Sequence, residues 1–183
     1  MAKKSQSKGG KERPYELYLM RHGIAADLDD HSASDDSKRP LTPEGKLKMR
    51  AIAQGLERAG VELDWVVSSP LRRAVETAEI VGGEIAPAAP VEHCAALAPG
   101  MLTAQKLTSF LAQHAERSRV LIVGHAPSLG ALASELIGAS LSANLGLRKG
   151  GCCLITFEEF PPQSAGLLNW WLTPRLLRKL GSQ

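Results

Sequence analysis

Residues 15–23 read Tyr15-Glu16-Leu17-Tyr18-Leu19-Met20-Arg21-His22-Gly23, and they contain the strand around which we expect the chain to fold. The run over residues 15–19 predicts a short buried strand. Residues 20–23 follow it directly, so the guanidinium of Arg21 and the imidazole of His22 are expected where the strand ends. Open α/β sheets bind their ligands at this edge. Gly23 is expected to let the backbone turn sharply near a ligand. Arg21 and His22 together suit an anionic ligand, because the guanidinium can bind its oxygens while the imidazole can act as a nucleophile.

Strands and helices are predicted to alternate along the rest of the chain. The expected strands span residues 64–68, 119–124, 150–157 and 167–172, and the first two helices run from Thr42 to Gly60 and from Pro70 to Gly82-Gly83. This alternation predicts an α/β fold, a three-layer α/β/α sandwich with a mostly parallel central sheet. We expect residues 14–180 to form a single domain. Residues 1–13 hold nothing to bury and are expected to be a disordered basic tail.

Composition limits the class of protein. The chain has 183 residues, of which 44% are hydrophobic and 22% charged, so wholesale disorder is excluded. The net charge of +3 arises mostly at the two ends, so we expect no nucleic-acid partner. No apolar stretch approaches the roughly 18 residues of a membrane span. No apolar segment suggests a secretory signal, and the three cysteines show neither metal spacing nor a disulfide framework. A cytoplasmic protein with no membrane partner is expected.

Two further strand-to-helix junctions carry polar side chains. Residues 68–74 include Arg72 and Arg73, and residues 123–127 include His125. The carboxyl ends of parallel strands meet at one edge of a sheet, so these side chains can converge with those of the first strand. One His at a strand end is more often structural, but two His and an Arg at three such junctions favour an anion site.

Taken in order, these motifs resemble the histidine phosphatase superfamily, which is phosphoglycerate mutase-like, and within it the SixA-like phosphohistidine phosphatases. The matching stretches are residues 19–23, 38–45, 69–78, 123–125 and 171–175. The similarity runs from about residue 16 to 176, so it covers nearly all of the expected domain. It implies a phosphoglycerate mutase-like fold without a large lid subdomain.

The resemblance also implies roles for residues. His22 would be the nucleophile, transiently phosphorylated, and Arg21, Arg73 and His125 would surround the transferred phosphoryl group. Arg73 is chosen because the family's Arg immediately precedes the Ala of the motif.

Two other arginines are open to more than one interpretation. Arg72 is expected on the solvent face or packed along its stem. Arg39 occupies a loop position that in the SixA-like branch can reach the phosphate pocket, and a salt bridge with the neighbouring Asp-rich loop is an equal alternative.

The chemistry suits these residue types and requires no metal or cofactor. Phosphoryl transfer depends mostly on positioning and on stabilising negative charge, which guanidinium groups do well. Neutral imidazole is a good nucleophile near pH 7 and forms a phosphoramidate that hydrolyses readily. Residues 27–36 carry several Asp with His31 and could bind a cation, but a solvated loop is the favoured interpretation.

The sequence lacks a carboxylic acid at the position where many members of the superfamily have one, and this affects which substrate is expected. Many members of the superfamily supply a carboxylic acid that protonates an alcohol leaving group, whereas residues 95–103 contain none. Glu92 is the nearest candidate, although a solvent-facing position is expected for it. The sequence therefore favours phosphohistidine in a phosphotransfer protein of signal transduction, and an open pocket without a lid fits such a partner. The alternatives are a broad phosphomonoesterase for small phosphorylated substrates, an inert phosphate-binding module and, more weakly, a mutase.

Overall fold

One six-stranded sheet organises the protein. The computed structural model describes residues 14–27, 35–139, 145–159, 161–162 and 164–182, and the expected tail over residues 1–13 lies outside these ranges. The sheet order is β3-β2-β4-β1-β5-β6. Strands β1 to β4 pair in parallel, whereas β5 pairs antiparallel with β1 and β6 antiparallel with β5. The strands are β1 (Tyr15–Arg21), β2 (Trp65–Ser68), β3 (Val91–His93), β4 (Arg119–Gly124), β5 (Cys152–Phe157) and β6 (Leu167–Leu172).

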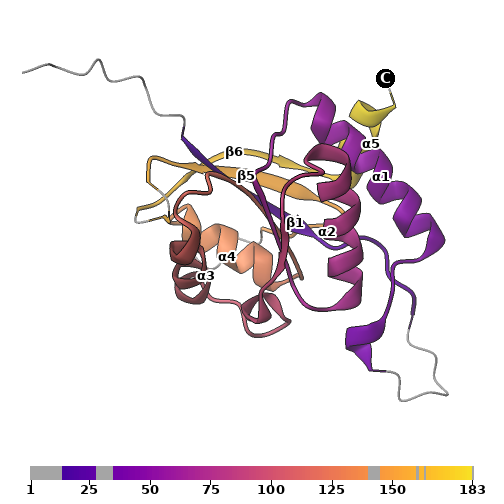
Figure 1. Cartoon of the computed structure of the whole chain (residues 1–183), viewed down its shortest axis with the longest axis horizontal. Helices are drawn as coiled ribbons and strands as arrows, with labels where there is room; N and C mark the ends of the chain where they lie inside the picture. Colours follow the sequence, from indigo (N-terminus) through magenta and orange to yellow (C-terminus); the bar gives the residue numbers. More distant parts are fainter. Residues whose placement is uncertain (1–13, 28–34, 140–144, 160, 163, 183) are drawn as a thin grey trace, which may run out of the picture.

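Helices cover both faces of this sheet. Figure 1 shows α1, α2 and α5 on one side and α3 and α4 on the other, which confirms the predicted three-layer arrangement. Within the described ranges no large subdomain covers the edge where β1 and β4 end. The helices are α1 (Pro43–Arg58), α2 (Arg72–Ile85), α3 (Ala104–Leu111), α4 (Ser128–Leu136) and α5 (Pro174–Gly181), with short 3-10 turns η1 (Asp36–Lys38), η2 (Ala95–Leu97) and η3 (Ala112–His114).

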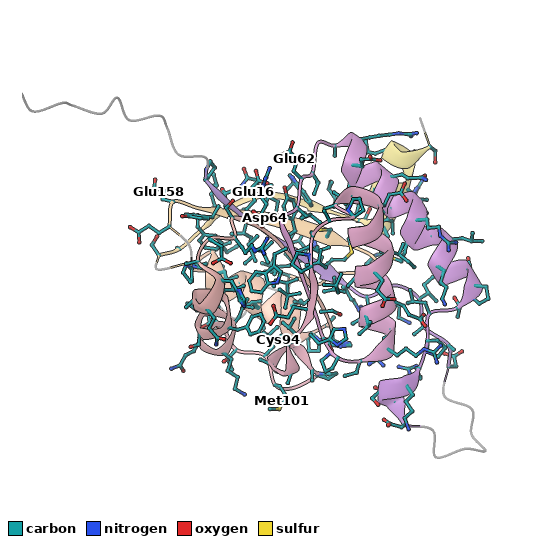
Figure 2. All side chains as sticks on the ribbon, in the orientation of Figure 1. Glu16, Glu62, Asp64, Cys94, Met101 and Glu158 are labelled. Carbon is teal, nitrogen blue, oxygen red and sulfur yellow. The ribbon has the colours of Figure 1, made fainter. Side chains whose placement is uncertain are left out.

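The opposite edge of the sheet, where β1 and β4 begin, is held by acidic side chains. Figure 2 shows Glu16, Glu62 and Asp64 gathered there. The Asp64 carboxylate accepts hydrogen bonds from the backbone N–H groups of Ser118 and Arg119 at 3.0 and 3.1 Å. This carboxylate fixes the start of β4, so it has a structural explanation and lies away from the predicted site.

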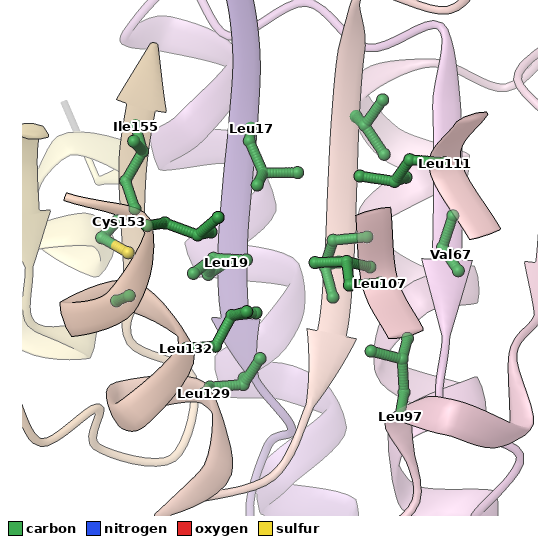
Figure 3. Close-up of a cluster of buried hydrophobic side chains, with 14 of the residues drawn as sticks. Leu17, Leu19, Val67, Leu97, Leu107, Leu111, Leu129, Leu132, Cys153 and Ile155 are labelled. Atoms are coloured by element: carbon green, nitrogen blue, oxygen red, sulfur yellow. The ribbon is translucent and has the colours of Figure 1, made fainter. Parts of the chain in front are cut away.

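Alternate residues of β1 feed two separate hydrophobic cores. Leu17 and Leu19 point into the core beneath α3 and α4, whose close-packed side chains are shown in Figure 3. Tyr18 and Met20 point into the core beneath α1 and α2. Strands buried on both faces are typical of parallel sheets, because crossover helices cover each side.

Helix boundaries only partly follow the sequence. Thr42 caps α1 as expected, since its side chain accepts from the backbone N–H of Gly45. The predicted stop at Gly82-Gly83 is wrong, because α2 continues to Ile85. Gly82 instead lies against Val66, where an added Cβ would come within 3.3 Å of the Val66 side chain. Helix α5 was not expected, although it begins with the same Thr-Pro pair as α1: Thr173 is its N-cap and Pro174 its first residue.

Among the described residues, no helix has the length and apolar character needed to cross a membrane. The acidic stretch considered as a cation loop falls largely on residues 28–34, which lie outside the described ranges. Among the residues inside them, no cluster of three or more His, Cys, Asp or Glu is placed to hold a metal ion.

Candidate active site

His22 lies directly after β1, at the edge where the parallel strands end. Its ring is only 6% exposed. Nδ1 lies 2.7 Å from the backbone carbonyl of Gly23. A carbonyl can only accept, so Nδ1 carries the proton and the lone pair of the neutral ring is on Nε2. The local backbone thereby selects the tautomer that a nucleophilic imidazole needs.

His125 reaches the same edge from the end of β4. The two imidazole ring centroids are 5.1 Å apart. Nε2 of His125 lies 2.8 Å from the hydroxyl oxygen of Ser69, which follows β2. Three adjacent strands therefore deliver one polar side chain each to a single place, as the three junctions predicted.

Arg73 is buried beside these rings at the start of α2. Its Nη1 and Nη2 donate to the backbone oxygen and the carboxylate of Asp36 at 2.8 and 3.0 Å. Arg21 uses Nη1 to donate to the Leu147 carbonyl at 3.0 Å. Within the described structure, the Nε atoms of Arg21 and Arg73 are buried without a hydrogen-bond partner. Because leaving such groups unpaired is costly, they are suited to receive oxygens of a bound anion.

The two arginines with open interpretations are now placed. Arg39 forms an ion pair with Asp36 at 2.8 Å, so the salt-bridge alternative is the one observed. Since Asp36 also binds Arg73, Arg39 is connected to the site through that carboxylate. Arg72 is exposed and pairs with Glu76 at 2.9 Å, which agrees with the solvent-facing expectation.

Three residues at the site had no predicted role. Ser69 contacts His125 and Asp36 holds Arg73, as described above. Buried Thr77 accepts from the backbone N–H of Gly23 at 3.0 Å and donates to the Arg73 carbonyl at 2.7 Å, so it ties α2 to the turn after His22. Thr77 lies four residues after Arg73, on the same face of the helix, and that spacing is a signal in the sequence.

Burial keeps both imidazoles neutral. Desolvation lowers the pKa of His22 to about 3, partly opposed by its hydrogen bond to Gly23 and reinforced by the charges of Arg73 and Arg21. Desolvation also lowers the pKa of His125 to about 4, and Arg73 contributes in the same direction. A neutral ring is the form that can attack phosphorus.

These shifts predict a pH dependence of stability. Each ring has a lower pKa in the folded chain than the ordinary value of about 6.5 expected after unfolding, so the unfolded chain binds more protons below that pH. Stability is therefore full above about pH 6.5 and falls toward the folded pKa, by on the order of 2 kcal/mol per histidine at pH 5. Urea unfolding at pH 7 and pH 5 should show a smaller loss for His125→Asn than for wild type. Equal losses in the two proteins would contradict the assignment.

Comparisons with known proteins agree with this geometry. A family model described as the histidine phosphatase superfamily (branch 1) matches residues 17–98. The phosphohistidine phosphatase SixA of Escherichia coli strain K12 is 32% identical over 165 residues, which cover 87% of this chain and 94% of that protein. A structure of the protein histidine phosphatase SixA complexed with tungstate superimposes with a TM-score of 0.75 at 28% identity, covering 88% of this chain and 99% of the other.

The chain therefore belongs to the histidine phosphatase superfamily, whose members are phosphatases. Within it the chain groups with the SixA-like branch. The fold alone is shared more widely. The α-ribazole phosphatase of Shigella flexneri superimposes with a TM-score of 0.65 at 20% identity, covering 87% of this chain and 96% of the other.

Proposed function

We propose that this protein hydrolyses phosphohistidine carried by a phosphotransfer protein, through a covalent intermediate on His22. The observation that carries the proposal is the 2.7 Å contact between Nδ1 of His22 and the Gly23 carbonyl, which favours the tautomer with the proton on Nδ1 and the lone pair on Nε2. Arg21 and Arg73 contribute buried, unpaired N–H groups beside it. An E. coli relative bears the name phosphohistidine phosphatase, which supports the same activity. Such a phosphatase acts in signal transduction.

The reaction takes place in two displacements. In the first, Nε2 of His22 forms a bond to phosphorus while the P–N bond to the substrate imidazole breaks. The substrate ring carries a proton on its other nitrogen beforehand, so it departs as neutral imidazole. In the second, water attacks phosphorus while the bond to His22 breaks, the protons of the water stay on the inorganic phosphate that is released, and His22 returns to its neutral form with the proton on Nδ1. Arg21, Arg73 and His125 stabilise the charge on the phosphoryl oxygens in both steps.

The carboxylates nearest the site are poorly suited to act as general acids, which favours an imidazole over an alcohol as the leaving group. Partial burial opposes ionisation of Asp36, but its hydrogen bond to Arg73 and the charge of that residue lower its pKa below the usual range. An ionised carboxylate cannot protonate an alcohol. Glu92, the candidate from the sequence, lies 3.7 Å from His114 Nε2, and residues 95–103 contain no carboxylate. An imidazole leaving group is protonated before it departs and needs less of the roughly 10²–10⁴-fold help that a general acid gives.

Parallel assays test the proposal. We expect kcat/KM for a phosphohistidine peptide to exceed that for propyl phosphate by at least about tenfold, because the alkoxide of this ester must leave without an acid. Both substrates are measured with one enzyme preparation at the same pH. Faster turnover of the ester would replace the proposal with a broad phosphomonoesterase acting on small phosphorylated substrates.

A further inference from the structure

A basic cavity of about 570 Å³ lies next to the phosphate site. Arg21 and Gly23, the two residues that flank His22 in the sequence, form part of its wall. His22, Arg73 and His125 do not line it. Of the residues proposed to surround the phosphoryl group, Arg21 is therefore the one that also lines this cavity. The rest of the cavity wall comes from other side chains.

The wall of the cavity is rich in positive charge. No carboxylate is among its lining residues, which include five cations: Arg21, Lys48, Arg148, Lys149 and Arg178. Lys48 pairs with Glu44 on the same helix. In the described part of the chain, no ion pair joins Arg148, Lys149 or Arg178 to an acidic side chain. The Glu44 carboxylate interacts with Lys48 and with the charge of Arg178, so it offsets part of this positive charge. The wall remains net positive, and an anionic ligand would reduce the repulsion among its cations.

The loop that carries Arg148 and Lys149 is fixed to the end of β1. The backbone N–H of Gly150 lies 3.0 Å from the Arg21 carbonyl and 3.2 Å from the His22 carbonyl, and the Arg21 N–H donates to the Gly151 carbonyl at 3.1 Å. Gly150 has a φ of +78°, which favours glycine, and an added Cβ would lie 2.8 Å from the Ile52 side chain. Two cations are thereby held at a set place relative to the nucleophile.

The other two cations come from the helix pair on this side of the sheet. Lys48 is on α1 and Arg178 is on α5. Buried Leu177 of α5 packs in the same hydrophobic core as Ile52 of α1. This packing brings Arg178 to the wall that Lys48 also lines. The five cations thus come from four separate segments (β1, α1, α5 and the loop before β5) rather than from one run of basic sequence.

We propose that this cavity binds acidic side chains of the phosphoprotein that lie beside its phosphohistidine, an inference that rests on the proposed function. Five cations exceed what a single phosphoryl group requires, so they suit several carboxylates. Arg148 and Lys149 are exposed, so their charges extend onto the outer surface, where a protein partner can reach them. Enclosure of a small metabolite would require a cover that the described residues do not provide.

Peptide binding and hydrolysis test this inference. Two synthetic peptides carry one histidine flanked by aspartates or by asparagines, each in unphosphorylated and phosphohistidine forms. Arg148→Gln/Arg178→Gln removes two charges from the cavity. Arg50→Gln/Arg175→Gln removes two exposed charges from α1 and α5, at positions that do not line it. Fluorescence anisotropy at low salt gives the affinity of the unphosphorylated peptides, and phosphate release gives KM and kcat.

We expect the wild type to bind the acidic peptide about tenfold more tightly than the asparagine peptide, with the difference in KM rather than in kcat. The cavity variant should lose this preference, the control variant should keep it, and 0.5 M salt should weaken it. Equal affinities for the two peptides, or a preference that survives in the cavity variant, would overturn the inference.

Other results separate this inference from the proposed function. Preferential binding of the acidic peptide without hydrolysis of either phosphopeptide would support the cavity and refute the phosphohistidine activity. A further comparison uses two inhibitors, 1,3-propanediol bisphosphate and propyl phosphate, on the wild type and on the Arg148→Gln/Arg178→Gln variant. If the two peptides bind equally and the bisphosphate is the stronger inhibitor of the wild type alone, the cavity binds small bisphosphates. The inference of a protein partner would then be wrong.

Discussion

Replacing His22 with alanine is expected to abolish turnover of a phosphohistidine peptide, with a fall in kcat of at least about 10³-fold. The reason is that His22 supplies the attacking Nε2 lone pair, whereas Nε2 of the neighbouring His125 is occupied by a hydrogen bond to Ser69. Rapid quench with a ³²P-labelled phosphohistidine peptide should trap an acid-labile adduct in the wild type and none in the variant. The fold should persist, since His22 lies at the polar edge of the sheet.

His93→Ala is the matched control, because His93 ends β3 at the same edge and is exposed. That variant should form the adduct and turn over as the wild type does. An adduct of normal amplitude in His22→Ala would place the covalent intermediate on another residue. Absence of an adduct in the wild type, together with tight binding of phosphate, would instead identify an inert phosphate-binding module.

The neighbouring arginines of α2 give the second large effect. Arg73→Ala is expected to lower kcat/KM by about 10²–10³-fold, because it removes a buried guanidinium from the phosphoryl group. Arg72→Ala should change it by less than about threefold, since that side chain is exposed and pairs with Glu76. Steady-state kinetics on the same phosphohistidine peptide measures both values.

Removing Arg73 also takes one of two ion-pair partners from Asp36, which keeps Arg39, so circular dichroism should accompany the kinetics. Arg73→Lys keeps the charge and separates loss of the fold from loss of function. This variant should remain folded yet stay well below wild-type activity, because an ammonium cannot present two donors in a fixed plane. A larger effect at Arg72 than at Arg73 would show that the wrong arginine is assigned to phosphate.

Much of the fold was predictable because the central strands are continuous apolar runs in the sequence. The run over residues 119–124 is buried in every described position after the first, and β1 and β2 are similarly clear. The stop at Gly82-Gly83 failed because a pair of glycines also permits close helix-to-sheet packing. Helix α5 was missed because its short leucine stripe has meaning only against α1, which is distant in the sequence.

The candidate site was predictable to the extent that it follows strand ends. His22 and His125 each come directly after a strand, and Arg73 lies in the first turn of the helix that follows β2, so topology brings them together. Asp36 could not be found in the same way, because η1 follows a long polar stretch and its partner Arg73 is 37 residues further on. The basic cavity was hidden for the same reason: its cations come from β1, α1, α5 and the loop before β5.

That separation of segments has an evolutionary consequence. The reacting groups come from β1, β4 and α2, whereas the surrounding charges come from α1, α5 and one loop, with only Arg21 in common. Substitutions at Arg148, Lys149 or Arg178 leave the hydrogen bonds of His22 and His125 untouched. A lineage built on this scaffold can therefore exchange its partners while the chemistry stays constant, and recognition and catalysis can diverge at different rates.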